Sequence, residues 1–286
     1  MLSSASEAGF RVKGASRLYL KLLADDTVND PGTEPLLPRF EVRVNGESIL
    51  NTRLTGKETT VTVFDGGETR DAEIRLIKLS ECTQSLMALA GIETDGIIEP
   101  LPARPVKIEF IGDSITCGYG VEGKDPEAPF TTEAENAAKA YAFLTAEALD
   151  ADAMLTSFSG YGIVSGYTED PAVPNERELV PPIYEREGWN PFRLPSGKQI
   201  QDTVRDFGAF QPDYIVLNLG TNDLSWCGTN QERGQLFARK YAEFLWTVRE
   251  HNPAARILCM LGIMGTGLNQ MVELAVDHYC RESGDR

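Results

Sequence analysis

A proline-rich segment at residues 99–105 divides the chain into two parts with different hydrophobic patterns. Its three prolines lack backbone donors and favour a stiff, extended linker. Before the segment, apolar residues alternate with polar ones, which is the period of strands exposed on one face. After it, continuous apolar runs alternate with helical patterns, which is typical of a parallel sheet covered by helices. A chain of 286 residues is therefore expected to form two domains, residues 1–103 and 104–286.

The N-terminal part contains short alternating runs and no helical pattern. The runs cover residues 17–22, 39–44, 59–64 and 71–79. The pair Asn45-Gly46 follows the second run and predicts a hairpin, because both residue types tolerate positive φ. The third run is expected to end at the turn residues of 65–67. Strands at this spacing predict an antiparallel β-sandwich.

The C-terminal part predicts a three-layer α/β/α domain with a parallel sheet, because strand and helix patterns alternate. Strands are expected at 106–111, 153–158, 213–219 and 255–261, and helices at 134–149, 199–207, 231–250 and 269–282. Residues 166–197 are rich in proline and show no clear period. Loops of that length usually have a function.

Charge and residue counts exclude several classes of function. Lys and Arg number 27 against 43 for Asp and Glu, a net charge of −16, which argues against nucleic-acid and membrane partners. Neutral substrates such as sugars are compatible with this charge. The five cysteines form no C-x-x-C pair and histidines number two, so we expect no metal, cofactor or disulfide scaffold. The oligomeric state stays open.

The start of the chain bears on its compartment. Residues 1–7 show neither the basic start nor the apolar run of a secretory signal. Together with the unpaired cysteines, this favours the cytoplasm. Export with a signal absent from this chain is the alternative.

Ser114 follows the first strand of the α/β part, in the stretch GDSIT at 112–116. Ligands bind at the carboxyl ends of strands in open parallel sheets. A serine there, at the start of a helix, is placed to attack a ligand, with the helix amides facing the developing negative charge. Serine is also a common N-cap, so a capping role is the alternative. The stretch matches neither G-x-G-x-x-G nor the P-loop pattern, which makes a flavodoxin-like nucleotide module a distant alternative.

Two further strand ends carry candidate residues. The third strand ends in NLGTND at 218–223, where the Asn222 amide could donate to an oxyanion or stabilise a turn. The second ends in SFSGYG at 157–162, where glycine lets a backbone amide approach a ligand closely or simply forms a turn.

Taken together, these three segments resemble, in order and strand context, the sequence blocks of the SGNH (GDSL-type) hydrolase superfamily. The resemblance implies that Ser114 is the nucleophile. It also implies an oxyanion hole made by the amides of Ser114 and Gly160 and the side chain of Asn222. Asp113, Gly220 and Asp223 are expected to support the turns rather than to act as the catalytic acid.

Within that superfamily, the stretches IEFIGDSITCGYG at 108–120 and NLGTND are similar to carbohydrate esterase family two. IKLSE at 77–81 resembles that family's last sandwich strand, and its members carry a jelly-roll domain before the hydrolase domain. The resemblance implies a serine esterase that deacetylates xylan, glucomannan or related acetylated carbohydrate without a cofactor. A non-catalytic carbohydrate-binding protein with a degenerate SGNH domain is the alternative. Aromatic residues at 161–192 are expected either to form a sugar platform or to pack the loop.

The chain departs from the family at the catalytic histidine. The family supplies it late, in a segment shaped like D-x-H-P or D-x-x-H, which does not occur here. His251 falls at a helix C-terminus and His278 within the last helix, so both are expected to be structural or solvent-facing. We therefore expect a C-terminally truncated chain, with the catalytic histidine beyond residue 286.

Overall fold

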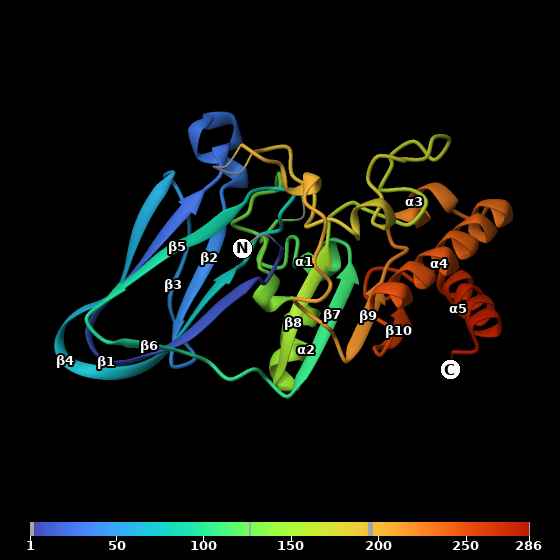
Figure 1. Cartoon of the computed structure of the whole chain (residues 1–286). Helices are drawn as coiled ribbons and strands as arrows, with labels where there is room; N and C mark the ends of the chain where they lie inside the picture. The colour runs from blue at the N-terminus through green and yellow to red at the C-terminus, as the bar shows by residue number, and fades with distance from the viewer. Residues whose placement is uncertain (1–2, 126, 194–196, 286) are drawn as a thin grey trace.

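The computed structural model describes residues 3–125, 127–193 and 197–285. Two parts lie side by side (Figure 1): an antiparallel sheet built by the first hundred residues, and a parallel sheet with helices built by the rest. The predicted fold class is confirmed. Within the described ranges, no helix has both the length and the apolar composition required to cross a membrane.

The antiparallel sheet has the strand order β3-β2-β4-β1-β5, with β6 also pairing β1. Its strands are β1 (Glu7–Ala24), β2 (Arg39–Val44), β3 (Glu47–Arg53), β4 (Glu58–Lys78), β5 (Met87–Thr94) and β6 (Ile97–Pro100). The long strands β1 and β4 each run through two layers. In each strand, the N-terminal half and the C-terminal half contribute to the same core. Phe10 and Leu20 come from the two halves of β1, and Val61 and Leu76 from those of β4.

The bend between the two layers explains one wrong prediction. The run at 59–64 does not end at 65–67, because β4 continues to Lys78. Gly66 and Gly67 have φ of 93° and 87°, values that only glycine adopts easily, and the pairing with β1 shifts register there instead of ending. The predicted hairpin at Asn45-Gly46 is confirmed, since Val44 pairs with Glu47.

The start of the proline-rich segment is also more regular than predicted. Glu99 and Pro100 belong to β6 and lie opposite Arg11 and Phe10 of β1. Proline is tolerated here because, among the described strands, β6 pairs with β1 alone and is therefore an edge strand. The irregular linker between the sheets begins after Pro100.

The parallel sheet has the order β10-β9-β7-β8. Its strands are β7 (Val106–Gly112), β8 (Ala151–Ser157), β9 (Tyr214–Asn218) and β10 (Arg256–Met260). The α-helices are α1 (Ser114–Cys117), α2 (Tyr141–Ala148), α3 (Asp223–Cys227), α4 (Gln231–His251) and α5 (Asn269–Ser283). Short 3-10 helices cover Asp26–Asn29, Pro31–Leu36, Ala137–Lys139, Pro181–Ile183 and Ile200–Asp202.

Two predicted helices are wrong in extent. The helix expected at 134–149 is a 3-10 turn followed by α2, because Ala140 is extended between them. The helix expected at 199–207 is reduced to Ile200–Asp202. Beyond it, Val204 forms a bridge with Arg186 and the Arg205 amide donates to the Glu185 carbonyl, so tertiary pairing replaces the helical hydrogen bonds.

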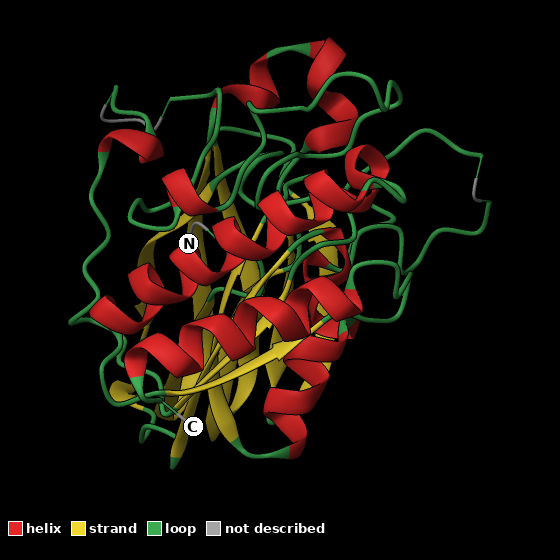
Figure 2. Ribbon diagram, turned by 90° about the vertical axis from the view of Figure 1, so that its right-hand side faces the viewer, coloured by secondary structure: helices red, strands yellow, loops and turns green. Residues whose placement is uncertain are grey.

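Helices cover both faces of the parallel sheet. Figure 2 shows the long helices α4 and α5 in front of the strands, where they form the larger core. On the other face, α2 packs together with residues of the antiparallel part. Ile77 and Leu79 share that core with Phe110 and Phe143. The two parts therefore have a common apolar interface, and loops of the first part lie against the second.

We expect β10 to promote self-association. It pairs only with β9 among the described strands, and Leu258 at its centre is 59% exposed. Flat apolar edge strands pair readily with other chains. Leu258→Lys should reduce the apparent mass of concentrated protein in light scattering. Leu274→Lys on α5, which removes a similarly exposed leucine away from the edge, is the control. An equal effect of both variants would contradict the role of the edge.

Candidate active site

Ser114 stands where β7 ends and α1 begins. The Asp113 carboxylate accepts a hydrogen bond from the Ile115 amide at 3.0 Å and so caps this helix. The N-cap is therefore Asp113 and not Ser114, for which a capping role was the alternative. Gly112 is required by crowding, since a Cβ there would lie 2.0 Å from Thr116 Oγ1. The amides of Ile115, Thr116 and Cys117 all donate to Asp113, so within this single-turn helix the amide left to attract a negative charge is that of Ser114.

The backbone amides of Ser114, which follows β7, and of Gly160, which follows β8, have no acceptor among the described residues. Gly160 has φ of 85°, and its carbonyl accepts from the Tyr167 amide at 2.7 Å, which fixes the local backbone. Both amides are therefore available to a negatively charged oxygen.

Asn222 follows β9 and is nearly buried. Its amide nitrogen donates to the Tyr161 carbonyl at 2.8 Å and lies 3.4 Å from Asp113 Oδ2. The shorter bond fixes the plane of the amide. The longer bond is weak, so the N–H group that makes it can exchange Asp113 for another nearby acceptor at small energetic loss.

Asp223 and Gly220 lie in the turn around Asn222. The Asp223 carboxylate accepts from the amides of residues 163, 164 and 165 at 2.7 to 3.1 Å, and so braces the loop that follows Gly160. Gly220 has φ of 130° and packs against Phe237. The Asp223 carboxylate is thus occupied by backbone amides of the loop.

Burial, with a smaller contribution from the neighbouring Asp223 charge and against the hydrogen bond from the Ile115 amide, raises the pKa of Asp113 to about 7. Burial likewise raises the pKa of Asp223 to about 6, against the opposing effect of its three backbone hydrogen bonds. Two acidic groups at the carboxyl ends of the strands therefore change charge close to neutral pH.

We predict that Asp113→Asn stabilises the protein at pH 8 but not at pH 4. Because the pKa is higher in the folded than in the unfolded state, the folded state binds more protons between these pH values. Wild-type stability thus falls as the pH rises from about 4 to about 7, by on the order of 4 kcal/mol for this group. Asparagine stays neutral and caps helices equally well. Urea unfolding across this pH range measures the difference.

The control is Asp95→Asn, which should show the opposite sign. A hydrogen bond from the Ser16 hydroxyl, followed by backbone amides, lowers the pKa of Asp95 to about 2. Its stabilising effect is present above the unfolded pKa and is lost as the pH falls toward 2. If Asp113→Asn did not become more stable than wild type as the pH rises, the buried charge at position 113 would not be what destabilises the wild-type protein at high pH.

Neither histidine lies at this site. His251, at the end of α4, pairs with Glu185 at 2.7 Å and stacks on the Phe207 ring at 3.9 Å between centroids. His278 is exposed on α5, 3.6 Å from Glu282. A histidine base for Ser114 is thus not found among the described residues.

The aromatic residues of the long loop divide between two roles. Tyr161 and Tyr184 are buried in the core of the parallel part, so they pack the loop. Tyr167 and Trp189 are exposed and can still contact a ligand.

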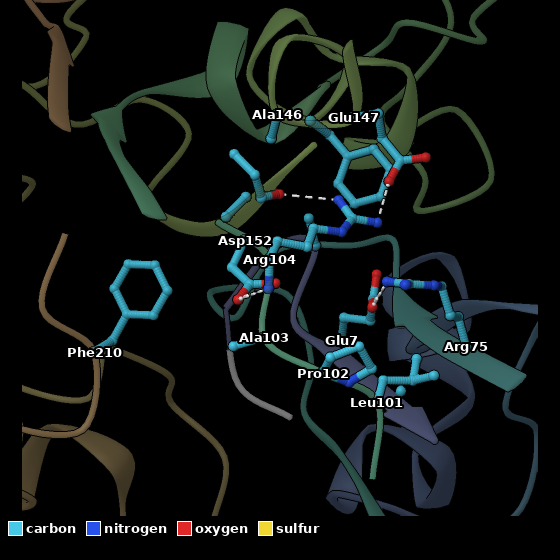
Figure 3. Close-up of a pocket in the computed structure, with 15 residues that line it drawn as sticks. Glu7, Arg75, Leu101, Pro102, Ala103, Arg104, Ala146, Glu147, Asp152 and Phe210 are labelled. Atoms are coloured by element: carbon cyan, nitrogen blue, oxygen red, sulfur yellow. Dashed lines mark hydrogen bonds and ion pairs between the residues drawn. The ribbon is translucent and has the colours of Figure 1, made fainter. Parts of the chain in front are cut away.

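A cavity of about 320 Å³ lies away from Ser114, at the opposite edge of the sheet where β8 begins (Figure 3). Four of its charged side chains form ion pairs, Arg104 with Glu147 at 2.8 Å and Arg75 with Glu7, and Asp152 accepts from the Arg104 backbone amide at 3.2 Å. The cavity is lined by the linker and by residues of both parts, and Ser114, Gly160 and Asn222 are not among its lining residues.

One buried residue near Ser114 was missed by the sequence analysis. Glu81 accepts a hydrogen bond from the Ser159 amide at 2.8 Å. In the described part of the chain, Glu81, Cys117 and Glu135 bring possible metal ligands within 4.8 Å of one another. Glu81 is occupied by protein donors, however, and Lys78 is buried beside this group. The stretch IKLSE at 77–81 predicted the end of a strand, but nothing in its sequence indicated that Lys78 and Glu81 would be buried.

A serine at the first turn after β7, with free amides at the ends of two parallel strands, is an arrangement that serine hydrolases require. Residues 110–282 match the model of the GDSL-like Lipase/Acylhydrolase family. The chain belongs to this family.

Curated relatives of this chain are esterases by name. The Cellulase/esterase CelE of Acetivibrio thermocellus is 33% identical over 255 residues, which cover 86% of this chain and 29% of that protein. An Acetylxylan esterase / glucomannan deacetylase of Cellvibrio japonicus is 32% identical over 200 residues, covering 65% of this chain and 51% of that protein. The chain thus spans less than two thirds of these relatives.

Solved structures with the same fold include two carbohydrate esterases. An acetyl xylan esterase from the rumen bacterium Butyrivibrio proteoclasticus matches with a TM-score of 0.85 and 25% identity, over 100% of this chain and 80% of that chain. A family two carbohydrate esterase from Clostridium thermocellum, in complex with cellohexaose, matches with a TM-score of 0.79 and 26% identity, over 99% of this chain and 80% of that one. The predicted resemblance to family two carbohydrate esterases is confirmed.

Proposed function

We propose that this chain is a serine esterase that removes acetyl groups from carbohydrate. The observation that supports the proposal is that the amides of Ser114 and Gly160, which follow the neighbouring parallel strands β7 and β8, have no acceptor among the described residues. The names of the relatives support acetylated xylan or glucomannan as the substrate class. These names do not favour the alternative of a binding protein without activity.

In the proposed mechanism, Ser114 Oγ attacks the acetyl carbonyl carbon. The carbonyl oxygen becomes negatively charged and accepts hydrogen bonds from the amides of Ser114 and Gly160 and from Asn222. The bond to the sugar oxygen then breaks, which leaves an acetyl group on Ser114 and a free sugar hydroxyl. Water attacks the acetyl-enzyme and releases acetate.

A base must accept the Ser114 proton in the first step and deliver it to the leaving sugar oxygen. Both histidines of this chain are engaged elsewhere. We infer that the base is a histidine outside these 286 residues. No step of this mechanism requires a cofactor or metal.

Acetate release from acetylated xylan and acetylated glucomannan tests the proposal. We expect slow release by residues 1–286 alone and faster release when imidazole is added, because the small base substitutes for the missing histidine. Release with imidazole by wild type but not by Ser114→Ala supports the esterase. Binding of the sugars without any Ser114-dependent release would support the non-catalytic alternative.

Asn222→Ala is expected to lower the imidazole-assisted chemical rate about 10²–10³-fold, since one donor to the oxyanion is lost. The fold should persist, because the hydrogen bonds of this amide among the described residues are one to a carbonyl and a longer one to a carboxylate. Rate constants for 4-nitrophenyl acetate and circular dichroism measure both. A loss confined to KM would instead make Asn222 a residue for binding or for the turn.

A further inference from the structure

Glu81 is a buried carboxylate that the proposed mechanism does not use. It follows β4, in the segment that leads to β5, and so belongs to the antiparallel part of the molecule. Its side chain is fully buried. Burying a carboxylate is unfavourable unless it is hydrogen-bonded, so the donors that it contacts indicate its role.

Two donors reach the same oxygen of Glu81. The Ser159 amide donates to Oε2 at 2.8 Å, and the Cys117 thiol lies 3.5 Å from it. Ser159 immediately precedes Gly160, and Cys117 ends the single-turn helix that begins at Ser114. One oxygen atom therefore contacts both segments that carry the free amides of the candidate oxyanion hole.

Glu81 is itself held firmly. Its amide donates to Glu135 Oε1 at 3.0 Å, and the ammonium group of Lys78 donates to the carbonyls of Ser80 and Glu81. Lys78 and Glu135 are also fully buried. A connected network of buried polar groups is rigid, because each displaced member would leave a donor or acceptor without a partner.

We propose that Glu81 is a positioning residue that sets the Gly160 amide relative to Ser114, so that the antiparallel part completes the active site. The inference rests on the proposed function, since it assigns Glu81 to the same oxyanion hole. A shift of the loop by one ångström would misplace one donor while leaving the nucleophile present.

The rate at which Ser114 reacts with diethyl 4-nitrophenyl phosphate in imidazole buffer tests this role. Ser114 Oγ bonds to phosphorus, 4-nitrophenolate leaves and imidazole takes the hydroxyl proton, while the phosphoryl oxygen needs the oxyanion donors. Glu81→Ala should slow labelling about 10²-fold. Glu81→Gln should recover to within about tenfold of wild type, because its amide oxygen still accepts from Ser159 through a weaker, uncharged bond.

Thr132→Val is the matched control for a structural effect. The buried Thr132 hydroxyl donates to the Leu37 carbonyl at 2.7 Å, so this variant loses a contact between the two parts without touching Ser159 or Cys117. It should label at the wild-type rate. Labelling of Glu81→Ala as fast as Thr132→Val, or no recovery in Glu81→Gln, would overturn the proposal.

Deuterium exchange separates this inference from the proposed function. Residues 158–162 should exchange faster in Glu81→Ala than in Thr132→Val, and this readout needs no chemical reaction. Unchanged exchange there would overturn positioning by Glu81 even if sugars were deacetylated. Conversely, if no acetate were released, the proposed substrate would be refuted. The labelling rates and the deuterium exchange would still decide the role of Glu81.

Discussion

Ser114→Ala is expected to reduce imidazole-assisted acetate release by several orders of magnitude, to the rate of the buffer alone. The reason is that the attacking oxygen is removed, while the amides of residues 114 and 160 can stabilise a transition state only if a nucleophile is present. Acetate release from acetylated xylan and 4-nitrophenyl acetate hydrolysis measure the loss. The fold should be unaffected, because the Asp113 carboxylate, and not the Ser114 hydroxyl, caps α1.

Ser159→Ala is the matched control for this variant. Ser159 lies at the same end of the sheet, its buried hydroxyl has no partner among the described residues, and its amide contact to Glu81 is unaffected by the change. It should retain wild-type activity. If Ser114→Ala kept more than about a tenth of the rate, another nucleophile would have to carry the reaction.

Glu109→Ala is expected to destabilise the protein by about 3–5 kcal/mol. Glu109 on β7 pairs with Arg205 at 2.7 Å, and both side chains are nearly inaccessible to solvent. Removing the carboxylate leaves the guanidinium buried without its ion pair, and the Thr156 hydroxyl loses an acceptor at 2.6 Å. Chemical denaturation at neutral pH measures the change.

The double variant Glu109→Leu with Arg205→Met distinguishes the ion pair from simple packing. Replacing both charges by apolar side chains leaves no unpaired charge, so it should be much less destabilising than Glu109→Ala. Arg205 also stacks on Phe207, at 4.4 Å from the guanidinium carbon to the ring centroid. Methionine cannot fully replace this contact, so some loss of stability should remain in the double variant. If the double variant were as unstable as Glu109→Ala, the loss of stability would not come from leaving Arg205 buried without its ion-pair partner.

Regular strands and long helices could be predicted from the sequence because their hydrophobic period is local. The apolar run around β9 and the striped pattern of α4 are examples. Predictions failed where tertiary contacts decide the backbone. Gly66 and Gly67 looked like a turn but bend a long strand, since β1 continues to pair beside them. Val204 looked helical but forms a bridge to Arg186.

The candidate site was predicted from residues that stand at strand ends, since parallel strands bring Ser114, Gly160 and Asn222 to one edge. The residues that support this edge could not be predicted in the same way. Glu81 is 33 residues before Ser114 and lies in another part of the fold, so only the packing of the two parts reveals its contact with Ser159. The raised pKa of Asp113 likewise follows from burial, which the sequence does not report.

The most direct test of the central claim is to identify which residue reacts with diethyl 4-nitrophenyl phosphate. The wild-type chain is treated in imidazole buffer, digested and mapped by mass spectrometry. The nucleophilic role and the oxyanion hole together predict a single modified peptide, with the diethylphosphoryl group on Ser114, and slower modification in Asn222→Ala. Modification of a different serine, or none on Ser114 in the folded protein, would contradict the assignment of this site.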